Sequence, residues 1–111
     1  MWLRSQHSTR RRVAPWLIVS VLPASEHAHV ETVRTLIAAG VPLDHVNNLG
    51  WTALHEATVP GNGDPDHVTV VRLLLDAGAD ATIPDRNGTL SRQLAADAGH
   101  TAIVAELDRH R

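Results

Sequence analysis

The 111-residue chain contains no cysteine, and this absence removes several kinds of chemistry from consideration. Disulfide bonds, catalytic thiols and cysteine-ligated zinc sites are excluded, whatever the compartment. The chain also has little excess charge, with 10 basic and 12 acidic side chains and a formal net charge of -2. A nearly neutral chain produces no long-range field that would attract nucleic acid.

The motifs of common catalytic and cation-binding sites are missing as well. No serine lies in a nucleophile elbow, and no glycine-rich loop has the pattern of a phosphate site. The segment G-N-G-D-P-D at Gly61 to Asp66 lacks the acidic ladder and the closing glutamate of a calcium loop. We therefore predict no catalytic residues, no resident metal and no cofactor, and at most weak cation binding by Asp64 and Asp66.

What the chain does contain is a regular spacing of glycine and histidine. The step from His67 to His100 indicates a period of about 33 residues, whereas the step from Gly50 to Gly88 is longer by five. The longer step contains the segment between Ala57 and His67, and removing five residues there makes the two steps equal. A fixed period of this length is typical of repeat proteins, in which each unit buries an apolar face on its neighbour.

Two motifs within this period resemble the ankyrin repeat. T-A-L-H-E-A at Thr52 to Ala57 is similar to the family's T-P-L-H-x-A, and L-L-L-D-A-G-A-D follows at Leu73 to Asp80. The resemblance implies an all-α solenoid of about three helix-turn-helix units joined by short β-hairpin turns. We expect the units at residues 21–47, 48–84 and 85–111, with a loop insertion at 58–66 and with residues 1–20 preceding or covering the array.

Apolar side chains recur along the second helix of each unit at the spacing of one helical face. The predicted stripes are Val33, Leu36 and Ile37 in the first unit, Val68, Val71, Leu74 and Leu75 in the second, and Ile103, Val104 and Leu107 in the third. Asp64 followed by Pro65 is typical of a helix start, and Gly40 and Gly78 are typical of helix ends.

The third unit departs from the family pattern. L-S-R-Q at Leu90 to Gln93 replaces the T-P-L-H residues, and the loss of the histidine puts the tightness of the last turn in question. Asp108 stands where the second unit has Leu75. We interpret these polar residues as the outer face of a capping repeat, because nothing stacks beyond such a unit.

The recurring residues are expected to hold the repeats together. The resemblance implies that His55 hydrogen-bonds Thr52 and the neighbouring backbone, and that His29, His67 and His100 have backbone-bonding roles. The residues assigned to the structural motif are Gly40, Gly50, Thr52, His55, His67, Gly78, Gly88 and His100. A metal-dependent enzyme that uses some of the eight histidines is the weaker alternative, because most of these positions already have a structural role.

Residues 1–20 do not follow the repeat and allow more than one interpretation. Arg10 to Arg12 precede the apolar run Val13–Leu22, which has the outline of a signal peptide but is too short to span a bilayer. An exported form would begin near Ala24 or Ala28, but Val21–His29 falls in register with the first helix of a repeat, so cleavage would cut into the array. We favour a segment that covers the first repeat, with solvated arginines rather than phosphate ligands.

Trp51 is the strongest candidate for binding. It follows the turn glycine Gly50, at a variable position that faces the partner in ankyrin repeats. The alternative is that the indole packs against the neighbouring turn, although an exposed indole is uncommon without a function. The predicted partner-binding residues are Trp51, Asn48, Leu49, Glu56, Arg86, Asn87 and Thr89.

These patterns together predict a non-catalytic protein-interaction module that binds another protein through its turns and first helices. The step from fold to function rests on the family resemblance. We expect no nucleic-acid or membrane partner, a cytoplasmic location and a monomer, with self-association through the N-terminal end as an alternative.

Overall fold

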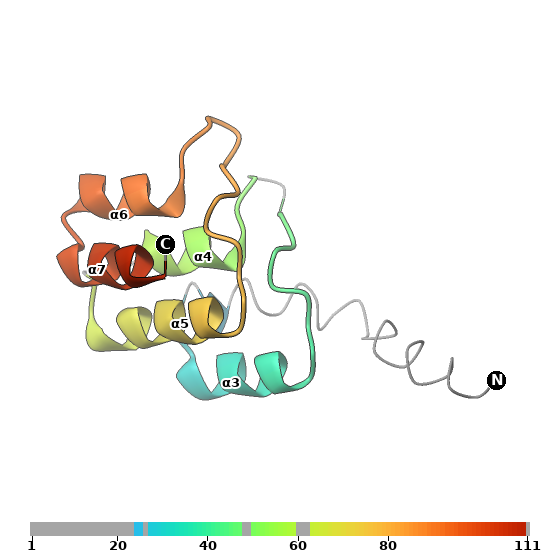
Figure 1. Cartoon of the computed structure of the whole chain (residues 1–111). Coiled ribbons are helices and arrows are strands. Elements are labelled where there is room, and N and C mark those ends of the chain that lie inside the picture. The colour runs from blue at the N-terminus through green and yellow to red at the C-terminus, as the bar shows by residue number, and fades with distance from the viewer. Residues whose placement is uncertain (1–23, 26, 48–49, 60–62, 111) are drawn as a thin grey trace.

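The computed structural model describes residues 24–25, 27–47, 50–59 and 63–110 of the chain. Within these residues the helices are α3 (Val30–Ala38), α4 (Ala53–Thr58), α5 (Pro65–Asp76), α6 (Ser91–Ala98) and α7 (Thr101–Arg109) (Figure 1). The described part of the chain contains no strand, so the connections predicted as β-hairpins are hydrogen-bonded turns. The prediction of an all-α fold is confirmed.

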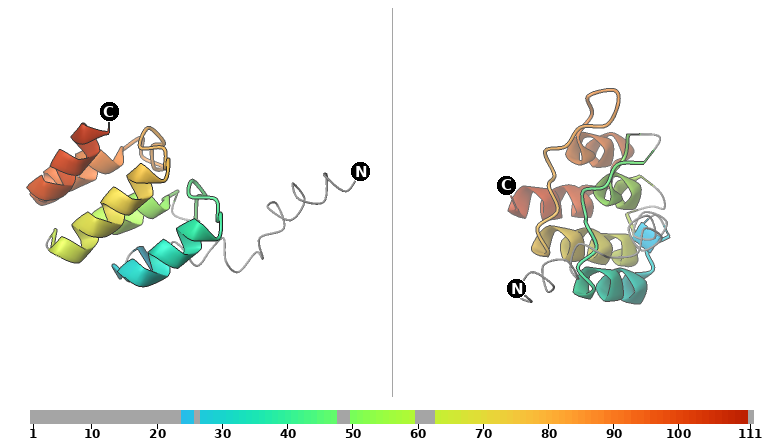
Figure 2. Two further views of the ribbon diagram at one scale, coloured as in Figure 1. Left: turned by 60° about the horizontal axis from the view of Figure 1, so that its bottom comes forward. Right: turned by 90° about the vertical axis from the view of Figure 1, so that its right-hand side faces the viewer.

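The helices are stacked in two layers. In one layer, α5 contacts α3 and α7, and the three helices run side by side (Figure 2). In the other layer, α4 contacts α6. The pairs α4 with α5 and α6 with α7 connect the layers. Each helix pair therefore covers the apolar face of its neighbour, as the repeated pattern predicts.

The core between the layers is built from the predicted stripes. Val33, Leu74 and Ile103 are completely buried, with no exposed surface. The other buried stripe residues are Leu36, Val71, Leu75 and Leu107, and the partly buried ones are Ile37, Val68 and Val104. The apolar face of α3, for which the sequence analysis expected a covering segment, is therefore buried.

The start of α5 follows the prediction made from Asp64 and Pro65. The Asp64 carboxylate accepts a hydrogen bond from the backbone N–H of His67 at 2.9 Å, and Pro65 occupies the first turn. This N–H and the side chain of His67 together lower the pKa of Asp64. The predicted helix start is confirmed, since an acceptor before the helix and a proline without an N–H both suit this position.

Ion pairs join the second helices of the last two repeats. The Glu106 carboxylate lies 2.8 Å from guanidinium nitrogens of Arg72 on α5 and of Arg109 on α7. Hydrogen bonds from these two arginines lower the pKa of Glu106 from 4.5 to about 2. Nearby, Nε2 of His110 lies 2.6 Å from the Asp76 carboxylate. The contact between α5 and α7 thus combines buried apolar side chains with paired charges at its edge.

The segments that precede α3 and α7 end with the same hydrogen bond. The backbone N–H of His29 donates to the carbonyl of Ala24, and that of His100 donates to the carbonyl of Ala95, both at 2.9 Å. The residue before each histidine has a left-handed backbone, with φ of 55° at Ala28 and 78° at Gly99. Ala28 therefore adopts a conformation that costs an L-residue about 1–2 kcal/mol and that glycine adopts freely.

Replacing Ala28 with glycine should therefore stabilise the protein. The relieved strain exceeds the extra entropy that glycine gives the unfolded chain, about 0.4–1 kcal/mol, so we expect a net gain of about 0.5–1 kcal/mol. Urea denaturation followed by circular dichroism measures the change. Gly99→Ala is the matched control and should destabilise the protein; a loss of stability in Ala28→Gly would contradict the assigned backbone conformation.

Several predictions concern residues outside the described part of the chain. These are the covering or signal segment at residues 1–20, including Arg10 to Arg12, the whole apolar run Val13–Leu22, and the middle of the loop insertion at residues 60–62. The longest helix among the described residues is α5 with 12 residues. None of the described helices has the length and apolar character needed to cross a bilayer.

Candidate functional site

The turns before α4 and α6 have the same hydrogen-bonded geometry. In the first, the N–H of Asn47 donates to the carbonyl of Trp51 at 2.9 Å, and the Asn47 side-chain oxygen accepts the N–H of Trp51 at 3.0 Å. In the second, Asp85 makes the corresponding bonds with Thr89, at 2.9 and 2.8 Å. Asparagine and aspartate stabilise such turns because their short side chains reach the nearby backbone.

The two turns lie against each other. A Cβ atom added to Gly50 would lie 2.9 Å from the backbone nitrogen of Arg86, and the φ of Gly50 is 81°. Gly50 is therefore required both for its conformation and for this close approach. The backbone N–H of Asp80 also donates to the Asp44 carboxylate at 2.9 Å. The turns thus form one continuous ridge beside the layer of first helices.

Trp51 lies at the junction of the two turns and is half-buried. Its indole ring stacks on the imidazole of His55, with ring centroids 6.2 Å apart and planes 19° apart. Asp85 in the next turn has a lowered pKa, because it accepts hydrogen bonds from the N–H groups of Thr89 and Asn87 and from the Trp51 side chain. One part of the indole is held by the neighbouring turn, as the packing alternative requires, and another part is exposed.

His55 connects two repeats through both ring nitrogens. The backbone N–H of Thr52 donates to Nδ1 at 3.2 Å, so this nitrogen is the acceptor and Nε2 carries the proton. Nε2 then donates to the carbonyl of Thr89 in the next turn, at 3.2 Å. The ring is buried, and burial lowers the pKa of His55 although the Thr89 carbonyl and the charge of Asp85 act in the opposite direction.

Stability should fall when the pH is lowered through the range in which His55 titrates. Because the pKa of His55 is lower in the folded than in the unfolded chain, its contribution is present above pH 6.5 and is lost as the pH falls toward the folded value. Urea denaturation at neutral and mildly acidic pH measures the loss. The pKa of His110 is raised and acts in the opposite direction, so the comparison is made with His55→Gln, which should lose less stability. Equal losses in both proteins would exclude His55 as the source.

Gln93 takes over part of the role of His55 in the third repeat. Its side-chain oxygen accepts the backbone N–H of Leu90 at 2.9 Å, just as Nδ1 of His55 accepts the N–H of Thr52. The first turn of α6 is therefore closed although the histidine is missing. The loss of the histidine, which put this turn in question, is compensated by an amide oxygen at the same place.

Arg92 and Asp108 form an ion pair between α6 and α7. The guanidinium nitrogens lie 2.6 and 3.1 Å from the two carboxylate oxygens, and both side chains are partly exposed. In the second repeat the corresponding residues are the buried Leu54 and Leu75. The proposal that the third repeat has a polar outer face rests on this exchange.

The predicted partner-binding residues have different positions. Arg86 and Asn87 are exposed at the tip of the second turn, and Thr89 is half-buried. Glu56 is only 7% exposed, so it offers little surface to a partner in this chain. Asn48 and Leu49 lie outside the described residues. The arrangement brings together Trp51 and the tip residues of the following turn.

Sequence reasoning missed Asp85 and the contact of Arg86 with Gly50. A signal for Asp85 was available, because its distance in sequence from Asn47 equals that of Gly88 from Gly50 and it is the same kind of turn former. The contacts between the turns had no such signal, because they depend on how neighbouring repeats are rotated relative to each other.

Most of the described histidines bond to protein groups. Nδ1 of His100 donates to the Thr58 carbonyl at 2.9 Å, which joins the third repeat to the second. His67 contacts Asp64, and the rings of His27 and His29 stack at 5.7 Å. No three side chains of the types that bind metals lie together in the described part of the chain.

Comparisons with known proteins agree with the sequence pattern. The profile of a family described as "Ankyrin repeats (3 copies)" matches residues 21–110. YahD of Escherichia coli (strain K12), which is named as an ankyrin repeat protein, is 34% identical over 87 residues, covering 78% of this chain and 43% of YahD. The crystal structure of an ankyrin repeat domain from Acinetobacter baumannii AYE is 50% identical, with a TM-score of 0.79 over 81% of this chain and 46% of that one.

A second solved structure, of the ankyrin repeat protein EF0377, is 33% identical with a TM-score of 0.79, over 82% of this chain and 46% of that one. The chain thus spans less than half the length of each of these three proteins.

Proposed function

The chain belongs to the ankyrin repeat family, and we propose that it is a non-catalytic module that binds another protein through the ridge of turns and the first helices. Ankyrin repeats are generally protein-interaction modules without catalytic activity. The proposed contact residues are Trp51, Arg86, Asn87 and Thr89, together with Asn48 and Leu49 of the first turn. A cytoplasmic location is part of the same proposal.

The observation that supports this surface is the environment of Trp51. The indole is fixed by His55 and by Asp85, yet it remains partly exposed, and Arg86 and Asn87 of the next turn are exposed. Tryptophan and arginine are the residues most often found where protein interfaces gain their binding energy. A rigid aromatic group flanked by polar groups has the composition of a specific protein interface.

Trp51→Ala is the experiment that tests the proposal. We expect affinity capture from a lysate of the source organism to recover a partner with the wild type and much less of it with the variant. Isothermal titration with that partner should show binding weakened by about 2 kcal/mol or more, roughly thirtyfold in Kd.

The control separates lost contacts from lost folding, because Trp51 also packs within the repeat. Asn87→Ala should weaken binding while leaving the unfolding free energy unchanged, and Arg34→Ala, in the exposed surface of α3 on the other layer, should change neither. Partner binding that is insensitive to both Trp51→Ala and Asn87→Ala would place the contact surface elsewhere.

A further inference from the structure

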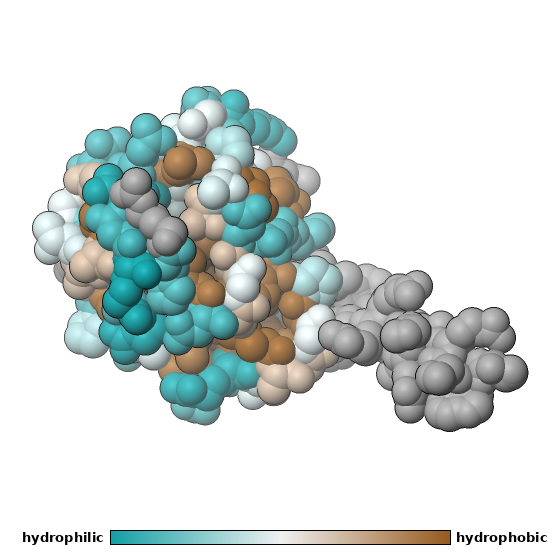
Figure 3. Space-filling model, in the orientation of Figure 1, coloured by the Kyte–Doolittle hydropathy of each residue, from teal (hydrophilic) through white to brown (hydrophobic). Residues whose placement is uncertain are grey.

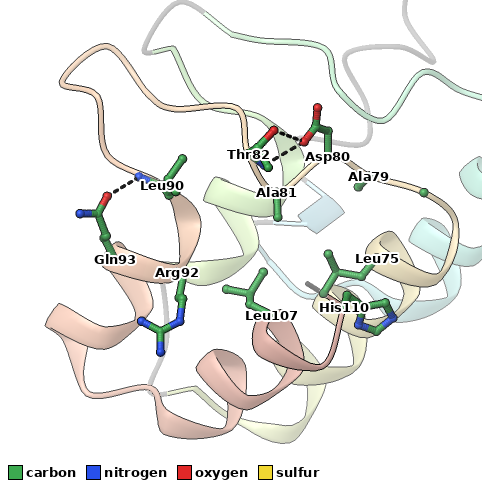
Figure 4. Close-up of a pocket in the computed structure, with 11 residues that line it drawn as sticks. Leu75, Ala79, Asp80, Ala81, Thr82, Leu90, Arg92, Gln93, Leu107 and His110 are labelled. Atoms are coloured by element: carbon green, nitrogen blue, oxygen red, sulfur yellow. Dashed lines mark hydrogen bonds between the residues drawn. The ribbon is translucent and has the colours of Figure 1, made fainter.

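An apolar groove opens between the C-terminal ends of α5 and α7, the segment Gly78–Thr82 and the start of α6 (Figure 4). Its volume is about 740 Å³, and its floor is formed by Leu75, Ala79, Ala81, Leu90 and Leu107. In the orientation of Figure 1, apolar surface is visible between polar residues on this side of the molecule (Figure 3). The groove lies apart from the proposed contact surface around Trp51.

The equivalent position in the second repeat is covered, and it shows what kind of segment fits there. One repeat earlier, Val41 stands in place of Ala79 and Thr52 in place of Leu90, and these residues are only 4% and 2% exposed. The next repeat lies against this part of the second one, because His55 donates to the carbonyl of Thr89. The segment that meets this kind of site one repeat earlier is thus the turn Asp85–Thr89, which offers a backbone carbonyl.

The third repeat keeps a donor for this carbonyl. Gln93 occupies the position of His55, and its oxygen is used by the N–H of Leu90. The amide nitrogen of Gln93 has no partner among the described residues, and Gln93 lines the groove. The open groove therefore has an apolar floor and a hydrogen-bond donor, as the corresponding covered position of the second repeat does.

The charges around the groove favour an uncharged occupant. Arg92 is paired with Asp108, and His110 with Asp76. The Asp80 carboxylate accepts hydrogen bonds from the N–H and the hydroxyl of Thr82. A charged segment would have to compete with these ion pairs and hydrogen bonds. An apolar segment that offers only its backbone polar groups would not.

We propose that the groove binds residues 13–20 of a second copy of the chain, the part of the apolar run that precedes the first repeat. This run has no charged residue, contains Trp16, Leu17, Ile18 and Val19 in succession, and supplies backbone carbonyls for Gln93. Its β-branched residues favour an extended conformation. In the sequence the run directly precedes the first repeat, whereas the groove is lined by residues of the second and third repeats.

This contact joins two different surfaces, so it gives a closed dimer when two copies exchange their runs and rings or longer species when they do not. Sedimentation velocity over about a hundredfold range of concentration should therefore show a mass that rises from the 12.0 kDa of one chain. A single species of one-chain mass at every concentration would overturn the proposal, and this includes the case in which the run covers its own chain.

Two full-length variants test the groove and the run separately. Ala81→Arg places a charge in the groove, and Ile18→Asp places one in the run, so each variant alone should remain a monomer. An equimolar mixture should form a 1:1 dimer and nothing larger, because only the groove of Ile18→Asp and the run of Ala81→Arg are intact. Ala102→Arg, at an exposed position of α7 outside the groove, should associate like the wild type.

Thermal unfolding followed by circular dichroism shows whether each variant is folded. Association of Ala81→Arg as strong as that of the wild type, or a mixture that stays monomeric while wild type associates, would exclude the groove as the site. Neither result would bear on partner binding through Trp51, because none of the named contact residues lines the groove.

Discussion

Leu74→Ala should destabilise the protein by about 2–5 kcal/mol and lower the urea concentration at which the chain unfolds. Leu74 has no exposed surface and lies in α5, the helix that packs against both α3 and α7. The substitution removes buried methyl groups and leaves a cavity in the core. Because a domain of this size has only about 5–15 kcal/mol of stability, such a loss is a large part of the total.

Urea denaturation followed by far-ultraviolet circular dichroism measures this effect through the midpoint and slope of the transition. Leu73→Ala is the matched control, because Leu73 is the preceding residue of the same helix and is only partly buried. It should cost clearly less than Leu74→Ala. Equal costs at the two positions would mean that α5 is rotated about its axis relative to the arrangement described above.

His55→Ala should cost about 2–4 kcal/mol, because it removes a bond within one repeat and a bond between two repeats. The buried N–H of Thr52 loses its acceptor, and a buried donor without a partner costs about 1–3 kcal/mol. The bond to the Thr89 carbonyl, worth about 1 kcal/mol, is lost together with the stacking on Trp51. Differential scanning calorimetry at neutral pH, at which the ring is neutral, measures the sum of these effects.

His55→Gln distinguishes hydrogen bonding from simple side-chain volume. In the third repeat, Gln93 already accepts the corresponding N–H, so glutamine at position 55 should recover a large part of the loss. His55→Leu has a similar volume but no acceptor and should not recover it. If leucine proved as good as glutamine, the contribution of His55 would come from packing alone.

The repeat arrangement could be predicted from the sequence because it depends on local patterns. The apolar residues of α5 occur at the spacing of a helical face, and Asp64 with Pro65 marks the start of that helix. The period of glycines and histidines then determines which segments are equivalent. These features need only the order of residues along the chain, and the structure follows them closely.

The details of the site were harder to predict, because they depend on contacts between repeats. Trp51 and Asp85 belong to different turns, far apart in the sequence, and their contact follows from the way one turn lies on the next. Glu56 was expected at the binding surface from its position in the repeat, but it is buried. From the sequence, Gln93 was interpreted as the loss of the turn histidine, because the residue type differs. In the structure, its side-chain oxygen accepts the same backbone hydrogen bond that Nδ1 of His55 accepts in the second repeat.

The close contact of the two turns has a consequence for the entropic cost of binding a partner. The close approach of Gly50 to Arg86 and the bond from Asp80 to Asp44 hold the described residues of neighbouring repeats against each other. A partner would thus meet a preorganised surface, and little conformational entropy would be lost when the complex forms. The same rigidity restricts the range of partner shapes, so selectivity would come from changing the tip residues and not from bending the ridge.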